Sequence, residues 1–334
     1  MLGENCPAGL LYYRVLEQGA AAISYCVNAF LIYLIVFHTP NDLKVYSRLL
    51  LCSCVVDCLF TTALFFTEPH AIVSEGVYFV ALNGPIHTPN PSLCFFLLCI
   101  FLFTFYFTVV FVTVPFVYRY FLICRNTLIN DARFYLLMAW SILSGTFVPI
   151  ACYFCYYDHM WSILLSKDTI SFLPCDYPAQ IPFFAMELTW ATATPLLIGA
   201  FTITYNYTVI IWCSVKIWSK VNSMRHMSQA VVTMNRQLNY MLLVQSVSPI
   251  ALMAVPVLAM FGAVFIGVKQ GAGMVLVTVA LSWIPVLNPL STIYFVKCYR
   301  IKICSILWNR KEGKQNTDVY TENCEFDISN DVFL

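Results

Sequence analysis

"LCFFLLCIFLFTFYFTVVFVTVPFVYRYFLI", residues 93–123, carries a single charged side chain, Arg119. An α-helix rises about 1.5 Å per residue, so about 20 apolar residues cross the hydrocarbon core of a bilayer. This stretch therefore predicts a membrane-spanning helix. The chain holds seven apolar runs of this kind, at 11–38, 46–67, 93–123, 132–156, 185–215, 237–264 and 273–297. The pattern predicts an all-α membrane protein, a bundle of seven transmembrane helices.

The composition of the whole chain supports this prediction. Of its 334 residues, 60% are hydrophobic and 10% are charged, whereas about a quarter of the residues in a soluble domain are charged. The few charges cluster in short islands between the apolar runs. A soluble globular protein is therefore excluded, and the odd number of runs places the two ends of the chain on opposite sides of a membrane.

The positions of the basic residues predict the orientation. Three of the 18 Lys and Arg residues, Arg14, Lys167 and Lys269, lie in or beside one set of alternate connecting segments, and the other 15 belong to the other set. Basic residues gather on the cytoplasmic side. We therefore expect an extracellular N-terminus (1–10), a membrane domain (11–297), an amphipathic juxtamembrane helix (298–310) and a disordered cytoplasmic tail (311–334).

Three connecting segments are longer than the others. Residues 68–92 contain "HTPNPS", whose two prolines favour an extended or turn conformation. Residues 157–184 are expected to form a long outer loop, and residues 216–236 to continue the fifth and sixth helices into the cytoplasm. Cys94 opens the third run and Cys175 lies in the second outer loop. The outer side is oxidising, so a disulfide between these two cysteines is chemically allowed.

Three polar side chains lie near the middle of apolar runs. Asp57 lies in the second run, Asn28 in the first, and Asn288 precedes Pro289 in the seventh. Polar groups at this depth are expensive and usually face the interior of a bundle. We expect them to form one buried polar cluster, with water or a cation. Two interpretations stay open: a hydrogen-bonded pin that only holds the helices together, or a switching element.

Arg119 follows Cys94 by 25 residues in the third run. At about 1.5 Å per residue this is about 38 Å, enough to reach from the outer headgroups to the inner ones. An Arg at a helix end is usually a snorkelling anchor. The spacing from Cys94 and the flanking Tyr118 and Tyr120 favour a functional cation at the cytoplasmic mouth of the bundle.

The outer half of the third run is apolar and aromatic. One face carries Leu97, Phe101 and Phe105, with Tyr106 beside it, and no carboxylate. A cavity lined in this way suits a small apolar or weakly polar molecule and argues against a cationic amine. Glu187, near the outer end of the fifth run, is the candidate anion at the rim. The alternative is that these aromatic residues only pack the core.

The segment after the seventh run mixes basic and apolar residues. "KCYRIKICSILWNR" is expected to form an amphipathic helix on the anionic inner leaflet, so membrane lipid is a predicted partner. Cys298 and Cys304 in this segment are candidates for palmitoylation. Two unmodified thiols are the equally open alternative.

The sequence contains no signature of catalysis. It has no paired intramembrane Asp, no phosphate loop, no Gly-x-Ser-x-Gly and no His-Glu-x-x-His, and its five His residues are scattered. We therefore expect no enzymatic activity, no metal, no cofactor and no nucleic-acid partner. The chain also lacks the internal repeat that many transporters have.

Several of these features together resemble the G-protein-coupled receptors. They are Asn28, Asp57, Cys94 with Cys175, Tyr118-Arg119-Tyr120 and Asn288-Pro289. "HTPNDLKVYSRLLL", "RQLNYMLLVQSVSP" and "NPLSTIYFVKCYR" are more specifically similar to the nematode serpentine chemoreceptors, with the delta class as the most similar and the str and h classes as neighbours. The resemblance covers the chain except its tail.

The resemblance implies a chemosensory receptor in the ciliary membrane of a sensory neuron, which binds a small molecule and activates a heterotrimeric G protein through its α subunit. It makes Cys94–Cys175 the outer disulfide and Arg119 the G-protein switch. Two positions depart from the general receptor pattern: Tyr118 replaces an acid, and Thr292 replaces the Tyr of Asn-Pro-x-x-Tyr. A seven-helix ligand-gated channel subunit and a transporter or intramembrane enzyme remain the alternatives.

Overall fold

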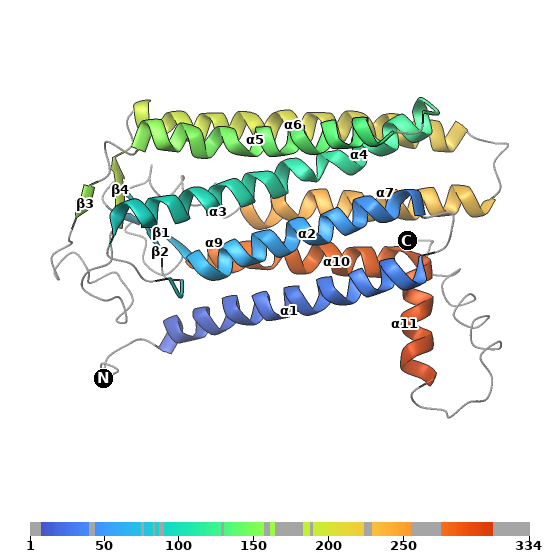
Figure 1. Ribbon diagram of the computed structural model, residues 1–334, viewed down its shortest axis with the longest axis horizontal. Helices are drawn as coiled ribbons and strands as arrows, with labels where there is room; N and C mark the ends of the chain where they lie inside the picture. Colours follow the sequence, from blue (N-terminus) through green and yellow to red (C-terminus); the bar gives the residue numbers. More distant parts are fainter. Residues whose placement is uncertain are drawn as a thin grey trace.

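The computed structural model describes residues 8–39, 44–74, 77–82, 84–86, 90–127, 130–156, 161–163, 183–187, 190–223, 229–254 and 275–309. Its long helices run side by side in one bundle (Figure 1). Each predicted apolar run contains one helix or one interrupted helix. In chain order they are α1 (Ala8–His38), α2 (Lys44–Thr67), α3 (Pro91–Phe111) with α4 (Thr113–Arg119) and the π-helical Tyr120–Cys124, α5 (Asp131–Tyr156), α6 (Trp190–Ser223), α7 (Gln229–Pro249) with the π-helical Ile250–Ala254, and α9 (Val275–Ser282) with α10 (Ile284–Phe295).

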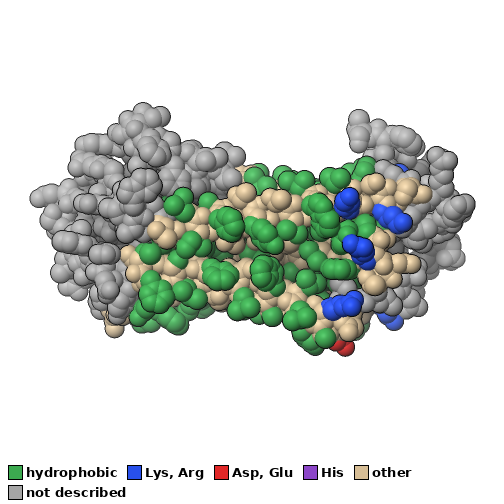
Figure 2. All heavy atoms as spheres, turned by 90° about the horizontal axis from the view of Figure 1, so that it is seen from above, with side chains coloured by type: hydrophobic (Ala, Val, Ile, Leu, Met, Phe, Trp, Pro, Cys, Tyr) green, Lys and Arg blue, Asp and Glu red, His purple; other side chains and the backbone are tan. Residues whose placement is uncertain are grey.

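The surface of the bundle is that of a membrane protein. Among the described residues, five helices are long and apolar enough to cross a membrane. One bent pair of helices, Val279–Phe295 and Lys297–Ser305, passes the same test when taken together. Figure 2 shows hydrophobic side chains along the middle of one face and Lys and Arg at one end. We call this end, where α1 ends and α11 (Lys297–Asn309) lies, the inner end, and the opposite end the outer end (Figure 1).

The third spanning segment is the most buried of the five long apolar helices among the described residues. α3 begins at Pro91 because Asn90 caps it: Asn90 Oδ1 accepts hydrogen bonds from the backbone N–H groups of Ser92 (3.0 Å) and Leu93 (3.4 Å). The segment is interrupted at Val112, between α3 and α4. Pro115, which lacks an N–H group, lies three residues further on, and a proline disrupts the helical ladder in this way.

The last spanning segment ends in a sharp turn. α10 and α11 meet at Val296, whose backbone is extended, and their axes differ by 86°. Tyr299 anchors α11 beneath the bundle, because its ring is fully buried and its hydroxyl lies 2.9 Å from Thr39 Oγ1 at the end of α1. A helix therefore lies where the juxtamembrane helix was expected. The expected N-terminal segment and tail lie mostly or wholly outside the described residues.

A small antiparallel sheet covers the outer end of the bundle. It consists of β1 (Pro69–Ser74), β2 (Val77–Leu82), β3 (Trp161–Ile163) and β4 (Phe183–Glu187), in the order β1-β2-β4-β3. Val80 and Leu82 of β2 bury their side chains in a hydrophobic cluster that also contains Phe60, Phe101 and Phe105. The sheet is therefore packed onto the bundle.

This sheet corrects two expectations from the sequence. Segments 68–92 and 157–184 were expected to be loops, and Glu187 was expected near the outer end of the fifth helix. Glu187 instead ends β4, where it pairs with Val77, and α6 begins at Trp190. The strand forms because β2 and β3 satisfy its backbone groups on both sides. Such partners are distant in sequence, so local patterns do not predict them.

Gly84 allows the chain after β2 to return close to the end of α2. A Cβ atom at residue 84 would lie 2.0 Å from the carbonyl oxygen of Phe66, and the Gly84 N–H donates to the Thr67 carbonyl at 3.2 Å. Gly19 in α1 differs, because no neighbouring atom lies within 4 Å of the corresponding Cβ position.

We therefore expect Gly84→Ala to destabilise the protein by about 2 kcal/mol, since the backbone of residue 66 must move. Gly19→Ala is the matched control and should stabilise the protein by about 0.5–1 kcal/mol, because Ala favours a helix interior. Thermal unfolding of the purified variants in detergent checks both. Equal melting temperatures for the two variants would contradict the close approach at Gly84.

Candidate functional site

A carboxylate and an amide bond directly at the centre of the bundle. Asn288 of α10 donates from Nδ2 to Asp57 Oδ1 of α2 at 2.7 Å, and both side chains are buried. Polar groups buried in a membrane interior need a partner, and this bond supplies one to both side chains. This bond joins the second and seventh spanning segments, as expected for two of the three central polar residues.

Asn28, the third central residue, has a different partner. Its Nδ2 donates to the Pro285 carbonyl at 3.1 Å and to the Ser24 carbonyl at 3.0 Å. Pro289 has no N–H group, so the Pro285 carbonyl lacks the donor that an ordinary residue at 289 would supply. Asn28 therefore satisfies a carbonyl that the proline leaves open in α10.

Two hydroxyl groups connect Asn28 with the segment of Asp57. Ser24 Oγ lies 2.7 Å from Thr61 Oγ1, and Thr61 Oγ1 donates to the Asp57 carbonyl at 2.8 Å. Ser24 Oγ also lies 3.4 Å from the Asn28 amide nitrogen. The three polar residues predicted from the sequence thus lie in one network, although the structure links Asn28 to it through Ser24 and Thr61.

A small cavity borders this network toward the centre of the bundle. Asp57 and Asn288 line it together with Ser53, Thr108 and Gln245, and it has room for about one water-sized molecule. Asn288 Oδ1 is buried without a hydrogen-bond partner among the described residues. These oxygen atoms suit water or a hard monovalent cation. In the part of the chain that the structure describes, no group of three or more His, Cys, Asp or Glu residues could hold a metal ion.

The sixth and seventh spanning segments are joined beside this cavity. Gln245 Nε2 donates to the Asn288 carbonyl and to Thr292 Oγ1, both at 2.9 Å. Thr292, which takes the place of the expected Tyr, is buried, whereas the Tyr294 side chain is 62% exposed on the outside of the bundle. The interior position of the motif is therefore filled by a small hydroxyl group, and Tyr294 does not take part in the network.

Arg119 lies buried near the inner end, with 1% of its surface exposed. Its Nη1 donates to Asn239 Oδ1 of α7 at 3.4 Å, and its guanidinium also hydrogen-bonds with Tyr46 of α2. Tyr118 packs edge-on against Tyr46, with ring centroids 6.4 Å apart. The sequence indicated that Arg119 lacks an adjacent acid, and the structure places a phenol and an amide around it instead. Tyr120 contacts the ring of Trp212 in α6.

The aromatic residues proposed to line a ligand cavity are packed against one another. Phe101 and Phe105 both contact the ring of Phe60, with centroids 6.4 and 6.0 Å apart. Tyr106 packs tightly against Gly199 of α6, where an added Cβ would lie 2.1 Å from its hydroxyl oxygen. Leu97 packs against the same cluster. None of these four residues lines the central cavity beside Asp57, or the pocket at the outer end that is described next.

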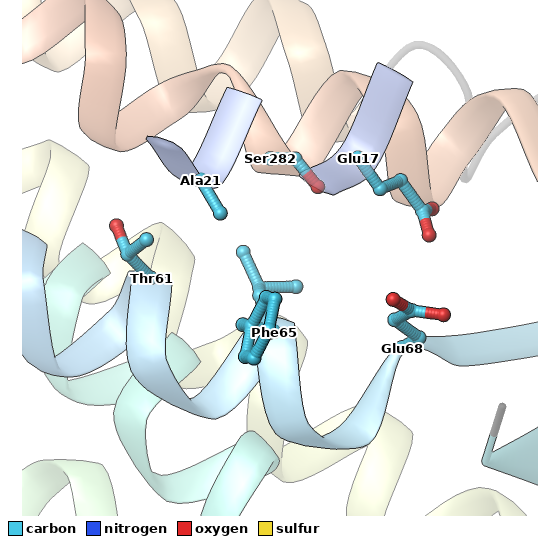
Figure 3. A pocket seen from close by; sticks show the side chains of 7 residues that line it. Glu17, Ala21, Thr61, Phe65, Glu68 and Ser282 are labelled. Atoms are coloured by element: carbon cyan, nitrogen blue, oxygen red, sulfur yellow. The ribbon is translucent and has the colours of Figure 1, made fainter. Parts of the chain in front are cut away.

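A second pocket, at the outer end, contains two carboxylates that the sequence analysis did not single out. Figure 3 shows Glu17 of α1 and Glu68, just after α2, pointing toward one another across a space that Thr61 and Ser282 also line. Glu68 has a left-handed backbone (φ 35°), which turns the chain from α2 into β1. Both side chains are buried. The argument against a cationic ligand was that the outer face of the third run carries no carboxylate. This pair lies on α1 and after α2 instead, so it adds outer carboxylates that the argument did not consider.

Spacing could have revealed this pair. Glu17 precedes Asn28 by 11 residues and Glu68 follows Asp57 by 11 residues. On two antiparallel helices these offsets correspond to the same displacement, about 16 Å, from the central polar level. Two acids at one level on neighbouring helices are expected to meet.

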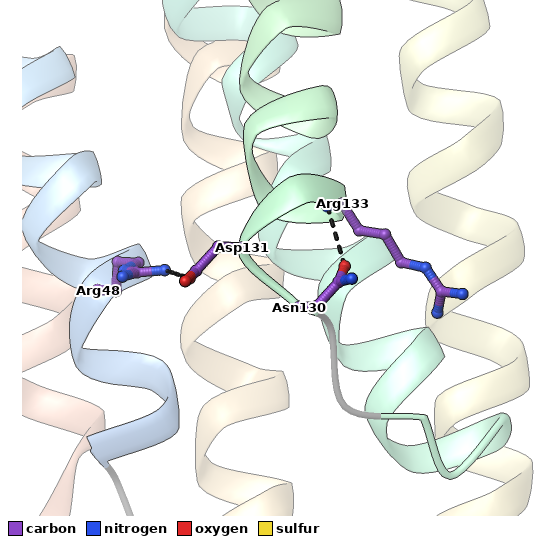
Figure 4. Close-up of polar contacts among 4 residues, drawn as sticks. All are labelled: Arg48, Asn130, Asp131 and Arg133. Carbon is purple, nitrogen blue, oxygen red and sulfur yellow. Dashed lines mark hydrogen bonds and ion pairs between the residues drawn. The ribbon is translucent and has the colours of Figure 1, made fainter.

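The inner end carries an ion pair and a helix cap on the surface (Figure 4). Arg48 of α2 pairs with Asp131 at the start of α5, and Asn130 Oδ1 accepts from the Arg133 N–H at 3.1 Å. The paired side chains are 54% and 73% exposed. Exposed pairs contribute about 0–1 kcal/mol, so this contact orients the ends of the helices more than it stabilises them.

The two cysteines of α11 are both half-buried. Cys298 packs against the inner hydrophobic cluster, and burial raises the pKa of its thiol to about 11. The thiolate is the nucleophile in acyl transfer, so Cys298 is poorly prepared for it at neutral pH. Cys94 is buried at the outer end of α3, and Cys175 lies outside the described residues.

Comparisons with known proteins agree with this geometry. The model of the family described as serpentine type seven-transmembrane G-protein-coupled receptor chemoreceptor Str matches residues 13–304. "Serpentine receptor class r-10" of Caenorhabditis elegans is 23% identical over 215 residues, which cover 59% of this chain and 62% of that relative, less than two thirds of its length. The crystal structure of squid rhodopsin matches with a TM-score of 0.63 and 13% identity, covering 97% of this chain and 92% of that one.

These matches confirm the seven-helix fold and the serpentine chemoreceptor resemblance. The matching family model is that of Str, which the sequence analysis named as a neighbour of the delta class. The family and the fold are those of multi-pass membrane receptors rather than of enzymes.

The role of Asn28 leads to a double-mutant prediction. Asn28→Ala should destabilise the protein by about 1–3 kcal/mol. The buried Pro285 carbonyl loses its shorter hydrogen bond and keeps only the longer one from Ser24 Oγ, at 3.4 Å. In a Pro289→Ala background the new N–H can bond that carbonyl, so Asn28→Ala should cost clearly less. Melting temperatures of the four proteins in detergent measure this coupling. Identical costs of Asn28→Ala in both backgrounds would refute the proposed role.

Proposed function

This chain belongs to the Str family of serpentine seven-transmembrane chemoreceptors, and we propose that it is a chemosensory receptor that couples a small external ligand to a heterotrimeric G protein. The ligand binds in the outer half of the bundle. The N-terminus is extracellular, the basic inner end faces the cytoplasm, and the receptor acts in the ciliary membrane of a sensory neuron.

The observation that carries this proposal is the burial of Arg119 between three spanning segments. Arg119 belongs to the third segment and bonds with Tyr46 of the second and Asn239 of the sixth. A buried cation held by neutral partners is costly to maintain. The arrangement therefore favours a switching role for Arg119 over that of a passive anchor. In the proposal, this is the closed state. A ligand that prefers the open packing shifts the population toward it.

Opening moves the inner half of α7 away from Arg119. This movement breaks the contact with Asn239 and uncovers the guanidinium for the α subunit of the G protein. Both α6 and α7 extend beyond the apolar runs at the inner end: α6 continues to Ser223 and α7 begins at Gln229. These extensions carry Lys216 and Lys220 on α6 and Arg236 on α7. These helix ends supply the remainder of the proposed G-protein surface.

Two features complete the proposed membrane arrangement. α11 lies along the inner leaflet, where its basic residues meet anionic lipid. Palmitoylation at Cys304, rather than at the packed thiol of Cys298, would anchor it further. At the outer end, a disulfide between Cys94 and Cys175 ties the loop after α5 to the start of α3.

The disulfide can be tested directly. Peptide mapping of the purified receptor under non-reducing conditions should yield a Cys94–Cys175 cross-linked peptide that reduction separates. Cys94→Ser, Cys175→Ser and the double variant should lose surface expression to a similar extent, because each removes the same bond. If the double variant instead lost as much surface expression as the two single variants together, the two cysteines would act separately.

The switch is tested by basal signalling in cells that express a promiscuous Gα subunit, normalised to surface receptor. Asn239→Ala should raise basal G-protein activation about two- to tenfold, since one hydrogen bond of about 0.5–1.5 kcal/mol leaves the closed state. Arg119→Ala should reduce activation to background. Arg125→Ala is the control, because this exposed cation lies six residues further on.

Unchanged signalling in Arg119→Ala would remove Arg119 from the mechanism. An ion current or substrate flux that persists without any G protein would favour a channel or a transporter instead.

A further inference from the structure

Two adjacent residues of α6 each hydrogen-bond a different neighbouring segment. Asn206 Oδ1 accepts from Thr113 Oγ1 of α4 at 3.0 Å. Tyr207 donates from its hydroxyl to the Ser246 carbonyl of α7 at 2.8 Å. Tyr207 also packs against both hydrophobic clusters of the bundle, the outer and the inner one. This pair thus lies where the two halves of the core meet.

Both contacts occur beside a proline interruption. Thr113 opens α4 directly after the break at Val112, two residues before Pro115. Ser246 lies three residues before Pro249, after which the sixth segment continues as a π-helix, Ile250–Ala254. Prolines and π-helical turns are the usual places where a helix bends. The pair on α6 therefore contacts two bending points at one level.

The backbone next to Pro249 is held from several directions. Pro249 has no N–H group for the Gln245 carbonyl, and Ser248 Oγ donates to that carbonyl at 3.2 Å instead. The Gln245 side chain bonds α10, as described above. Tyr207 bonds the following carbonyl, that of Ser246, from the side of α6. The turn that precedes the bend is thereby fixed between the fifth and seventh spanning segments.

We infer that Tyr207 is a positioning residue that holds the sixth segment closed through the Ser246 carbonyl, an inference that rests on the proposed receptor function. When α7 bends outward at Pro249, its backbone turns against α6 and the bond to Tyr207 is released. The hydroxyl thus sets the resting population of the closed state without touching the ligand or the G protein.

The geometry limits the size of the effect. In hydrocarbon the Ser246 carbonyl has no water to replace the hydroxyl. One intrahelical or interhelical hydrogen bond is worth about 0.5–1.5 kcal/mol, so removal of the hydroxyl alone should shift the closed–open equilibrium about two- to tenfold.

The test uses the full-length receptor in lipid nanodiscs and in cells. Tyr207→Phe removes one oxygen, and Tyr205→Phe is the matched control, because Tyr205 lies on the same helix with 48% of its surface exposed. Hydrogen–deuterium exchange of residues 241–250 should accelerate about two- to tenfold in Tyr207→Phe and not in Tyr205→Phe. Basal G-protein activation should rise by a similar factor.

A second variant separates the hinge from general instability. Pro249→Ala restores an N–H group for the Gln245 carbonyl and removes the proline at which the segment is inferred to bend, so Tyr207→Phe/Pro249→Ala should behave like Pro249→Ala alone. If Tyr207→Phe fails to fold but the double variant folds, the inference is supported; if both fail to fold, it is overturned.

The remaining outcomes are also decisive. Equal exchange and equal signalling in Tyr207→Phe and Tyr205→Phe would overturn the inference. Accelerated exchange in Tyr207→Phe, with no G-protein signal from any variant including Asn239→Ala, would support Tyr207 as the clamp and refute the proposed receptor function.

Discussion

A carbonyl group that loses its helical donor inside a membrane has no water to bond, and this constraint governs the interior of the bundle. Pro289 leaves the Pro285 carbonyl open, and Asn28 on α1 fills it. Pro249 leaves the Gln245 carbonyl open, and Ser248 fills it from the same helix. The prolines therefore create the demand for polar side chains at one level of the membrane.

The same constraint explains how much the sequence could predict. The seven runs and the depth of Asn28, Asp57 and Asn288 follow from hydropathy and rise per residue, because both are local properties. The partner of Asn28 is a backbone carbonyl, that of Pro285. Whether Asn28 meets this carbonyl or Asp57 depends on how α1 is rotated about its axis, and the depth of Asn28 in the membrane does not determine that rotation. The sheet depends on β2 meeting β4, about 100 residues later, and no periodicity in either segment encodes that pairing.

Two side chains illustrate the limits of motif comparison. The sequence indicated that Thr292 replaces the Tyr of Asn-Pro-x-x-Tyr. In the structure Thr292 lies inside, against Gln245, whereas Tyr294, two residues further on, lies outside. Glu17 and Glu68 were missed because charged residues at the edges of apolar runs normally mark where a span ends. Their equal spacing from the central polar level was the available signal, and it requires comparing two helices rather than scanning one.

In the part of the sixth spanning segment that the structure describes, the contacts that would hold the proposed closed state are single hydrogen bonds. The hydrogen bonds described are those of Asn239 with Arg119, of the Ser246 carbonyl with Tyr207, and of Gln245 with Asn288 and Thr292. At about 1 kcal/mol each, four such bonds contribute about 4 kcal/mol. Moving a two-state equilibrium from 1:99 to 99:1 requires a differential ligand affinity of about 5.5 kcal/mol. In the proposed mechanism the closed state is therefore stable enough to keep Arg119 covered and weak enough for a small ligand to reverse. Neutral partners take the place of buried acids in it: Asn239 accepts a hydrogen bond and Tyr207 donates one.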